Sequence, residues 1–381
     1  MPPKKRSRRG FGAIAKLPSG RYRARYTGPD LAWHNAPTTY GSKVDAEGWL
    51  AFERRLIDLG QWTPPATRGQ IKSLASRTIT EAVEDYIESR DITPGSAATY
   101  RSLLATRIEP YLGTTTVGEL TRHDVAKWVQ EMRLDHPDTR SRNSQAYRLL
   151  SSAMKREVGQ EVIEVNPCQS PEAGRKPKPA ETPLLTKEEY DTLVAALPER
   201  YRLMTKVMAG CAFRLGEVTE LRASDYRTVS SDPLVATLTV SRAASWVSGQ
   251  WEVGTPKSAA GVRTVTVPTS IAVNLQEHVT ARKRKAGSDA LIFPNRNGTR
   301  VRPQGFRSTF SKAATKAGRP DVSPHDLRHY GAVMAARTGA TVRELMDRLG
   351  HETPDMAIHY QHTAAGRDAE IASKMSEMFE E

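Results

Sequence analysis

Four residues near the C-terminal end of the chain have the types and spacing needed for chemistry on a phosphodiester. His325 and Arg328 are three residues apart, so on a helix their side chains project from one face. An arginine fork matches two oxygens of a phosphate group. His351 follows a glycine that predicts a helix end, and Tyr360 lies nine residues further on. Together they predict a phosphate-binding site with an attached nucleophile.

A tyrosine needs help to act as that nucleophile. A free phenol has a pKa of about 10, so it attacks poorly unless cations and a proton acceptor assist it. A second arginine, Arg214, follows an apolar stretch that predicts a buried helix. Two arginines can hold one phosphodiester between them, and the two histidines are available to handle a proton. These residues therefore favour attack of Tyr360 on a phosphate.

The order and spacing of these residues resemble those of the tyrosine recombinases. The chain is similar to the phage integrases of that family, in particular to actinobacteriophage integrases with an N-terminal arm-type DNA-binding domain. The family also carries a lysine on a β-hairpin turn, which Lys257 matches, because it precedes an alternating strand pattern at 261–267. The resemblance therefore implies six catalytic residues, which are Arg214, Lys257, His325, Arg328, His351 and Tyr360.

The resemblance also implies a mechanism. The tyrosine would attack in line and form a 3′-phosphotyrosyl bond, while the two arginines hold the non-bridging oxygens. Lys257 would protonate the departing 5′-oxygen, and the two histidines would position the phosphate and manage the proton of the nucleophile. Because the covalent bond conserves the energy of the phosphodiester, no cofactor and no metal are expected. Strand exchange at attachment sites would integrate and excise phage DNA.

The two residues that directly follow Arg328 are not expected to react. His329 is interpreted as a structural residue or a support for the site, and Tyr330 as a core residue. A zinc site is an alternative, since His325 and His329 are four residues apart. Metalloprotease helices carry glutamate after the first histidine, whereas Asp326 occupies that position here.

Two acidic residues follow the first arginine. Glu217 and Glu220 are expected to cap a helix or to pair with basic residues, and for Glu217 the alternative is that it orients part of the site.

Three other activities stay open beside the integrase. A cellular chromosome-dimer resolvase usually lacks the N-terminal extension. A type IB topoisomerase-like enzyme uses a similar site but needs no arm-type domain. A catalytically inactive DNA-binding regulator would have no reason to keep six catalytic residues.

Composition agrees with a nucleic-acid partner. The chain has 381 residues and a formal net charge of +13, which favours a polyanion. With only Cys168 and Cys211 there is no disulfide framework, so we expect a reducing cytoplasm. The resemblance implies that this is the cytoplasm of a bacterial host, in association with the nucleoid. No apolar run is long enough to span a bilayer, and the basic N-terminus lacks the apolar region of a secretory signal, so we expect no membrane partner.

Periodicity and turn residues predict a multidomain α+β fold. A small three-stranded sheet with one helix comes first, then a four-helix core-binding domain, then a mainly α catalytic domain with a small antiparallel sheet. Segments rich in proline separate them. The boundaries are 1–65 for the arm-type DNA-binding domain, 66–76 for a linker, 77–168 for the core-type DNA-binding helical domain, 169–183 for a second linker, and 184–381 for the catalytic domain.

The N-terminal domain carries arginines on one strand face. Strands are predicted at 11–17, 21–27 and 38–40, followed by a helix at 42–58 that begins with a capping motif. Alternation in the second strand buries Tyr and Ala residues and leaves an opposite basic face, which consists of Arg21, Arg23 and Arg25. A β-ribbon fits the major groove. We interpret this face as DNA-binding, with a merely solvated face as the alternative.

Helices of the second domain are predicted from 78, at 96–108, from 121 and at 138–158. Four of their arginines are candidate DNA contacts, namely Arg101, Arg140, Arg142 and Arg148. Basic clusters at 282–285 and 300–307 either follow the duplex or are ordinary surface.

The resemblance implies several partners. They are double-stranded DNA with core-type and arm-type sites, a homotetramer on that DNA, a host DNA-bending factor and a phage excision (directionality) factor. It further implies that a last amphipathic helix, predicted at 367–379, docks on a neighbouring protomer.

Overall fold

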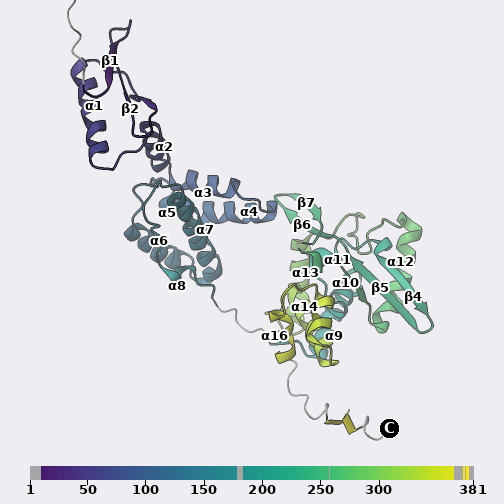
Figure 1. Cartoon of the computed structure of the whole chain (residues 1–381). Coiled ribbons are helices and arrows are strands. Elements are labelled where there is room, and N and C mark those ends of the chain that lie inside the picture. The colour runs from purple at the N-terminus through teal and green to yellow at the C-terminus, as the bar shows by residue number, and fades with distance from the viewer. Residues whose placement is uncertain (1–9, 178–182, 257, 364–371, 374, 377–381) are drawn as a thin grey trace, which may run out of the picture. The chain divides into compact units, whose positions relative to one another are not determined.

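A computed structural model describes residues 10–177, 183–256, 258–363, 372–373 and 375–376. Contacts divide the chain into two compact units, 1–178 and 179–381, each described here by itself (Figure 1). The division falls inside the second predicted linker, 169–183. The predicted last helix at 367–379 lies almost wholly outside the described residues. Within the described part of the chain, no helix has the length and apolarity needed to cross a membrane.

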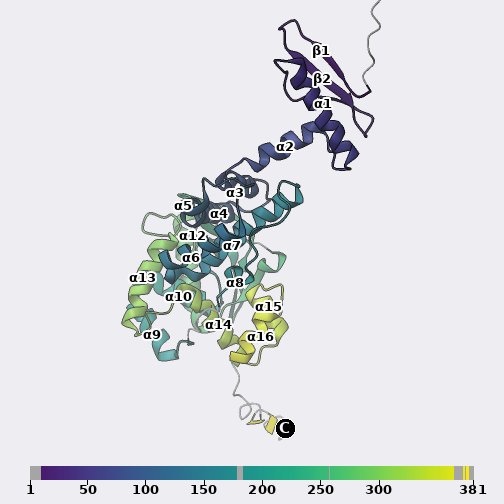
Figure 2. The same ribbon diagram turned by 90° about the vertical axis from the view of Figure 1, so that its left-hand side faces the viewer.

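The first unit begins with a three-stranded antiparallel sheet in the order β1-β2-β3 (Figure 2). Helix α1 packs against β2, and the small core consists of Ala24, Tyr26, Ala46 and Leu50. The elements are β1 (Ala13–Lys16), β2 (Tyr22–Thr27), β3 (Trp33–Asn35) and α1 (Lys43–Asp58). The predicted alternation of β2 is confirmed, since the Ala and Tyr side chains are buried or half-buried and the arginines are exposed.

The predicted third strand at 38–40 is wrong. Leu31 adopts a left-handed backbone conformation in a tight turn that Gly28 closes by a hydrogen bond to Ala32, so pairing with β2 starts at Trp33. Tyr40 makes only an isolated bridge with Tyr22. The capping motif of α1 is confirmed, because the side chain of Ser42 accepts a hydrogen bond from the backbone N–H of Asp45.

The segment predicted as a linker, 66–76, is helical, because it forms helix α2 (Pro65–Ala75). Prolines at 64 and 65 indicated a break, but Pro65 occupies the first turn, where a missing N–H costs no hydrogen bond. Arg68 pairs with buried Glu53 of α1, whose carboxylate also accepts from Tyr26 at 2.6 Å. At the other end, Leu74 and Ala75 pack on the helical core that follows.

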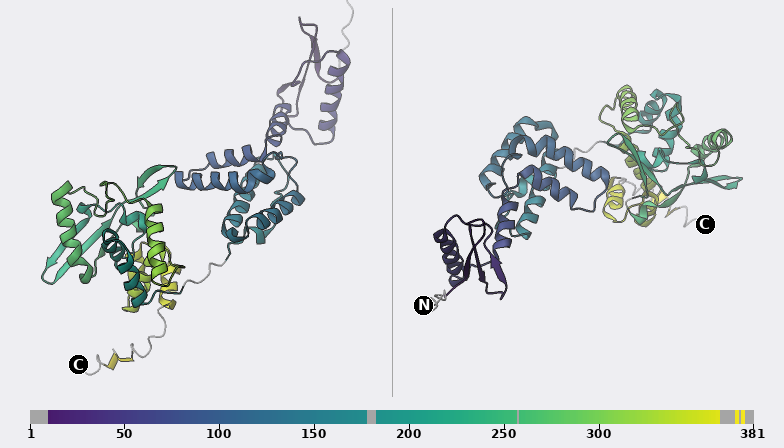
Figure 3. Two further views of the ribbon diagram at one scale, coloured as in Figure 1. Left: turned by 180° about the vertical axis from the view of Figure 1, so that it is seen from behind. Right: turned by 90° about the horizontal axis from the view of Figure 1, so that it is seen from above.

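That core is built from helices at the predicted positions (Figure 3). Trp128 of α6 is fully buried and stacks on Tyr147 of α7. Pro94 starts a helix after Thr93, which caps it. The elements are α3 (Ile79–Glu88), α4 (Pro94–Leu103), a π-helical turn (Leu104–Ile108), α5 (Glu109–Leu112), α6 (Arg122–Asp135), a 3₁₀ turn (Pro137–Thr139), α7 (Arg140–Gly159) and α8 (Pro171–Gly174).

The second unit is mainly helical around a small sheet. A large apolar core includes residues of α9, α10, α12, α13, α14 and the sheet. The helices are α9 (Lys187–Ala196), α10 (Glu199–Gly210), α11 (Leu215–Val218), α12 (Thr269–Ala286), α13 (Pro303–Lys316), α14 (Pro324–Arg337), α15 (Val342–Leu349) and α16 (Asp355–Thr363). The predicted multidomain α+β class is confirmed.

The small antiparallel sheet predicted for the catalytic domain is present, and the structure adds a separate two-stranded sheet. One has the order β4-β5-β8, from β4 (Tyr226–Ser231), β5 (Leu234–Val240) and β8 (Arg263–Thr266). The other is a hairpin of β6 (Ala243–Val247) and β7 (Gln250–Gly254). Ser248 and Gly249 both have positive φ, which is the geometry of a two-residue turn that connects the two strands of a hairpin.

Candidate active site

The second unit brings five of the six predicted catalytic residues into one neighbourhood. Helix α14 packs against α10, α15 and α16, so the ends of these helices meet. Arg214 precedes α11, His325 and Arg328 lie on α14, His351 follows α15, and Tyr360 lies on α16. The sixth, Lys257, lies outside the described residues.

Arg328 is held rigidly in the interior, with only 2% of its surface exposed. Its guanidinium donates to the carbonyl of Ala212 at 2.7 Å, to the carbonyl of Leu349 and to Nε2 of His351 at 3.0 Å. Burial, reinforced by the charge of Arg214, lowers the pKa of Arg328 to about 10, so it remains charged at neutral pH. A buried cation with fixed donors is organised before any phosphate arrives.

Arg214 is the more accessible arginine, with 43% of its side chain exposed. Its Nη1 donates to Oε1 of Glu217 at 2.8 Å, and its backbone N–H donates to Oε2 at 2.8 Å. Burial alone would raise the pKa of Glu217, but Arg263 and Arg214 outweigh it and hold the pKa below its ordinary value. The prediction that Glu217 caps a helix and pairs with basic residues is therefore confirmed, and one of those basic residues is the candidate Arg214.

His351 is neutral at physiological pH. Burial, followed by the charges of Arg328 and Arg214, lowers its pKa to about 4. Since Nε2 accepts from Arg328, the ring proton lies on Nδ1, which is buried and has no hydrogen-bond partner among the described residues. The predicted helix end is confirmed, because Gly350 caps α15 in the left-handed conformation.

Tyr360 is buried, as Arg328 is, with 3% of its surface exposed. It packs with Leu345 and Leu349, and its ring lies 5.0 Å from that of His329 and 6.2 Å from that of His351. Burial raises the pKa of Tyr360, although the nearby arginine charges oppose the shift. The phenol is therefore protonated at rest and needs an acceptor for its proton.

His325 is the second residue of α14, and its side chain is exposed at the edge of the cavity described below. Burial, followed by the charge of Arg328, lowers its pKa, so its ring is neutral and able to accept a proton at pH 7. Asp326 caps the helix, since its carboxylate accepts from the backbone N–H of Ser323 at 2.8 Å. This role explains why an acid follows His325, and no metal-binding group of three or more His, Cys, Asp or Glu occurs among the described residues.

His329 and Tyr330 have different surroundings although they are adjacent. The ring of His329 lies beside that of Tyr360, so it packs against the candidate nucleophile. Tyr330 stacks on Tyr190 at 5.0 Å within the large core, which confirms the interpretation as a core residue.

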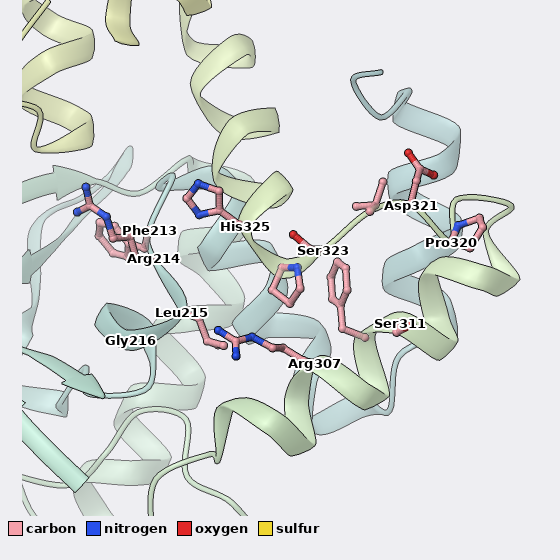
Figure 4. Close-up of a pocket in the computed structure, with 13 residues that line it drawn as sticks. Phe213, Arg214, Leu215, Gly216, Arg307, Ser311, Pro320, Asp321, Ser323 and His325 are labelled. Atoms are coloured by element: carbon pink, nitrogen blue, oxygen red, sulfur yellow. The ribbon is translucent and has the colours of Figure 1, made fainter. Parts of the chain in front are cut away.

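A cavity of about 570 Å³ opens beside the site (Figure 4). Arg214, His325 and Ser323 line one part of it, and Arg307 of α13 lines another. Arg307 belongs to the basic cluster at 300–307, so the structure places one member of that cluster next to the candidate catalytic residues.

Sequence analysis missed Arg263, which the structure shows to be buried against Glu217. A signal existed, because Arg263 shares the buried face of its strand with Val265. An arginine on the inward face of a strand requires a buried partner.

The predicted DNA-contacting arginines differ in their surroundings. Arg21 donates to Thr39, and Arg25 lies over the ring of Trp33. Arg101 is engaged in ion pairs with Glu84 and Glu88. The remaining residues are exposed, namely Arg23 on β2 and Arg140, Arg142 and Arg148 on α7.

Three protein-family models match successive parts of the chain. "Phage integrase, N-terminal domain" matches residues 10–59, "Phage integrase, N-terminal SAM-like domain" residues 78–133, and "Phage integrase family" residues 183–367. The integrase of Mycobacterium phage D29 is 37% identical over 373 residues, which cover 97% of this chain and 98% of that protein.

Solved structures share the fold at lower identity. A Tn1549 transposon integrase (residues 82–397) in complex with circular intermediate DNA has a TM-score of 0.65 at 16% identity, covering 79% of this chain and 100% of that one. A lambda integrase dimer bound to a core site has a TM-score of 0.57 at 19% identity and covers 95% of this chain and 98% of that one. Together with the near full-length similarity to the D29 integrase, the matched models show that the chain belongs to the phage integrase family of tyrosine recombinases.

Proposed function

We propose that this site-specific recombinase cuts and rejoins DNA through Tyr360, with Arg214 and Arg328 as the phosphate-binding residues. The observation that carries the proposal is the grouping of two arginines, two neutral histidines and one buried tyrosine. Donors fixed before the substrate binds stabilise the charge that develops on the phosphate oxygens in the transition state.

The proposed reaction is a transesterification. The Tyr360 oxygen attacks the phosphorus, a 3′-phosphotyrosyl bond forms, and the bond to the 5′-oxygen breaks. The tyrosine proton passes to His325, whose neutral ring can accept it, while Lys257 supplies a proton to the 5′-oxygen. His351 already accepts from Arg328 at Nε2, so it would position the phosphate through the guanidinium that it holds in place.

The reverse reaction completes recombination. A 5′-hydroxyl from a partner duplex attacks the phosphotyrosyl bond, reseals the strand and releases Tyr360. The sequence of two strand exchanges would integrate or excise phage DNA at attachment sites, without a cofactor.

The proposed partners follow from this chemistry and from the relatives. Solved relatives are a lambda integrase dimer on a core site and a lambda integrase tetramer on a Holliday junction, which supports duplex DNA and a homotetramer for this chain. The exposed arginines of β2 would bind arm-type sites, and those of α7 core-type sites. A host DNA-bending factor and a phage excision factor are part of the proposal, as is action at the bacterial nucleoid.

Covalent trapping tests the proposal. The protein is incubated with nicked duplexes from its own attachment region in EDTA and compared with Tyr360→Phe on a denaturing gel. We expect an adduct with the wild type only. An adduct that persists in Tyr360→Phe would mean that another residue is the nucleophile, and a mobility shift without any adduct would favour a DNA-binding regulator.

A further inference from the structure

Arg263, the first residue of β8, is a buried arginine with no assigned role. Only 5% of its side chain is exposed. Its Nη2 donates to Oε2 of Glu217 at 2.9 Å, its Nη1 to Oε1 of Glu217 at 3.2 Å and to the carbonyl of Gly261 at 3.1 Å. Its Nε donates to the carbonyl of Arg348 at 2.9 Å. Every nitrogen of the guanidinium is therefore used.

The partners of Arg263 belong to segments that each carry a candidate catalytic residue. Glu217 holds Arg214, and the guanidinium of Arg263 also lies 5.2 Å from the centre of the Phe213 ring, one residue before Arg214. Arg348 lies three residues before His351, near the end of α15. One side chain thus joins the segment that begins with Arg214 to the segment that ends with His351.

The packing around Gly350 shows how close this junction is. A Cβ on Gly350 would lie 2.7 Å from the carbonyl oxygen of Ala260 and 3.2 Å from the side chain of Arg263. The backbone that leads into His351 therefore packs closely against Arg263 and its strand. A change in the length or shape of the Arg263 side chain will displace His351.

We propose that Arg263 is a positioning residue that keeps Arg214 free for the phosphate and aligns it with His351. This inference rests on the proposed function of Arg214 and His351. Arg214 uses only Nη1 and its backbone N–H on Glu217, because Arg263 occupies the same carboxylate from the other side. Without Arg263, Glu217 would be a buried carboxylate with Arg214 as its sole cation among these partners, and would draw that guanidinium inward.

A second buried glutamate on the same segment provides a matched control. Glu220 is as buried as Glu217 and pairs with Arg300, Arg222 and Arg242, none of which contacts a candidate catalytic residue in the described structure. Arg300→Lys therefore perturbs a comparable buried ion pair without touching the proposed alignment.

The experiment compares single-turnover cleavage by the full chain on two nicked duplexes. One has an ordinary scissile phosphate and the other a methylphosphonate, which lacks the charge of one non-bridging oxygen and so needs one arginine less. The variants are Arg263→Lys, Arg214→Ala and Arg300→Lys. Arg263→Gln replaces Arg263→Lys if the lysine variant does not keep the wild-type melting temperature and DNA mobility shift.

We expect Arg263→Lys to lower cleavage of the phosphodiester by about 100-fold, the loss typical of a displaced reacting group, with DNA binding unchanged. On the methylphosphonate, the cleavage rate of Arg263→Lys should come closer to the wild-type rate. The same should hold for Arg214→Ala. Arg300→Lys should show the same rate ratio on both substrates.

Two outcomes would overturn the inference. One is wild-type cleavage of the phosphodiester by Arg263→Lys, and the other is an equal deficit on both substrates, which a merely structural role predicts. A failure of the proposed function can be distinguished from these outcomes. In that case the cleavage rate of Arg214→Ala, relative to wild type, would be the same on the methylphosphonate as on the phosphodiester.

Discussion

Arg328 donates a hydrogen bond to Nε2 of His351 at 3.0 Å, so the two residues act as a unit. The arginine is buried and charged, and the histidine must be neutral to accept from it. A proton added to Nε2 would break this bond and place two cations side by side. The relationship explains why the pKa of His351 falls to about 4, after burial has made the first contribution.

The first prediction concerns stability at acidic pH. The pKa of His351 is about 4 in the folded protein against 6.5 for an ordinary histidine, so between these values the unfolded chain binds more protons. The free energy of unfolding should therefore fall as the pH is lowered from 6.5 toward 4. Urea unfolding of the wild type and of His351→Asn at pH 7, 6 and 5 measures this. The variant should lose less stability over that range, and identical pH dependence in both proteins would contradict the assignment.

The second prediction concerns the nucleophile. Tyr360→Phe removes one oxygen from a ring that is packed with Leu345 and Leu349, so the fold should be unchanged. Covalent adduct formation should drop below detection. The mobility shift on attachment-site DNA should stay within about twofold of wild type, since removal of one buried hydroxyl leaves the phosphate contacts in place. His329→Gln changes the ring beside Tyr360 but keeps the Tyr360 hydroxyl, so this variant serves as the comparison.

The third prediction separates the two arginines. Arg214→Lys and Arg328→Lys should each lower cleavage by about 10²–10³, because each removes a fixed donor to the transition state. Only Arg328→Lys should also lower the free energy of unfolding, by about 2–4 kcal/mol, because it leaves buried carbonyls of Ala212 and Leu349 without their donor. Denaturant unfolding distinguishes them. Equal stability losses would show that burial of Arg328 is not what holds the site together.

The fourth prediction tests the contact between α10 and α14. A Cβ on Gly331 would lie 1.9 Å from the carbonyl oxygen of Ala209, so Gly331→Ala must push the two helices apart. We expect a destabilisation of about 1–3 kcal/mol, as for overpacked cores, together with reduced cleavage. Gly305→Ala on α13, where nothing lies within 4 Å, is the matched control and should be neutral or slightly stabilising.

The fifth prediction concerns the N-terminal sheet. Arg23→Ala should weaken binding to arm-type DNA and reduce the slope of log affinity against log salt by about 1, the value for one lost phosphate contact. Arg101→Ala should have a smaller effect on that slope, since Arg101 is already engaged with Glu84 and Glu88. Fluorescence anisotropy at several salt concentrations measures both, and equal slopes for Arg23→Ala and wild type would mean that the face is only solvated.

Local patterns in the sequence were enough for most of the elements and for the family. The alternation of β2, the capping motifs before α1 and α9, and the glycine that ends α15 depend on neighbours a few residues away, so they can be read along the chain. The motif residues could be chosen because their order and spacing resemble a known family. Prolines at 64 and 65 misled the prediction, since proline marks a helix start as well as a break.

Only the tertiary structure decided how those residues support one another. The bond between Arg328 and His351, the sharing of Glu217 by Arg214 and Arg263, and the burial of Tyr360 join residues from separate helices and strands. Sequence spacing carries no measure of such long-range contacts. They arise because a buried charge must find a partner wherever packing places one, and this requirement is met in three dimensions, not along the chain.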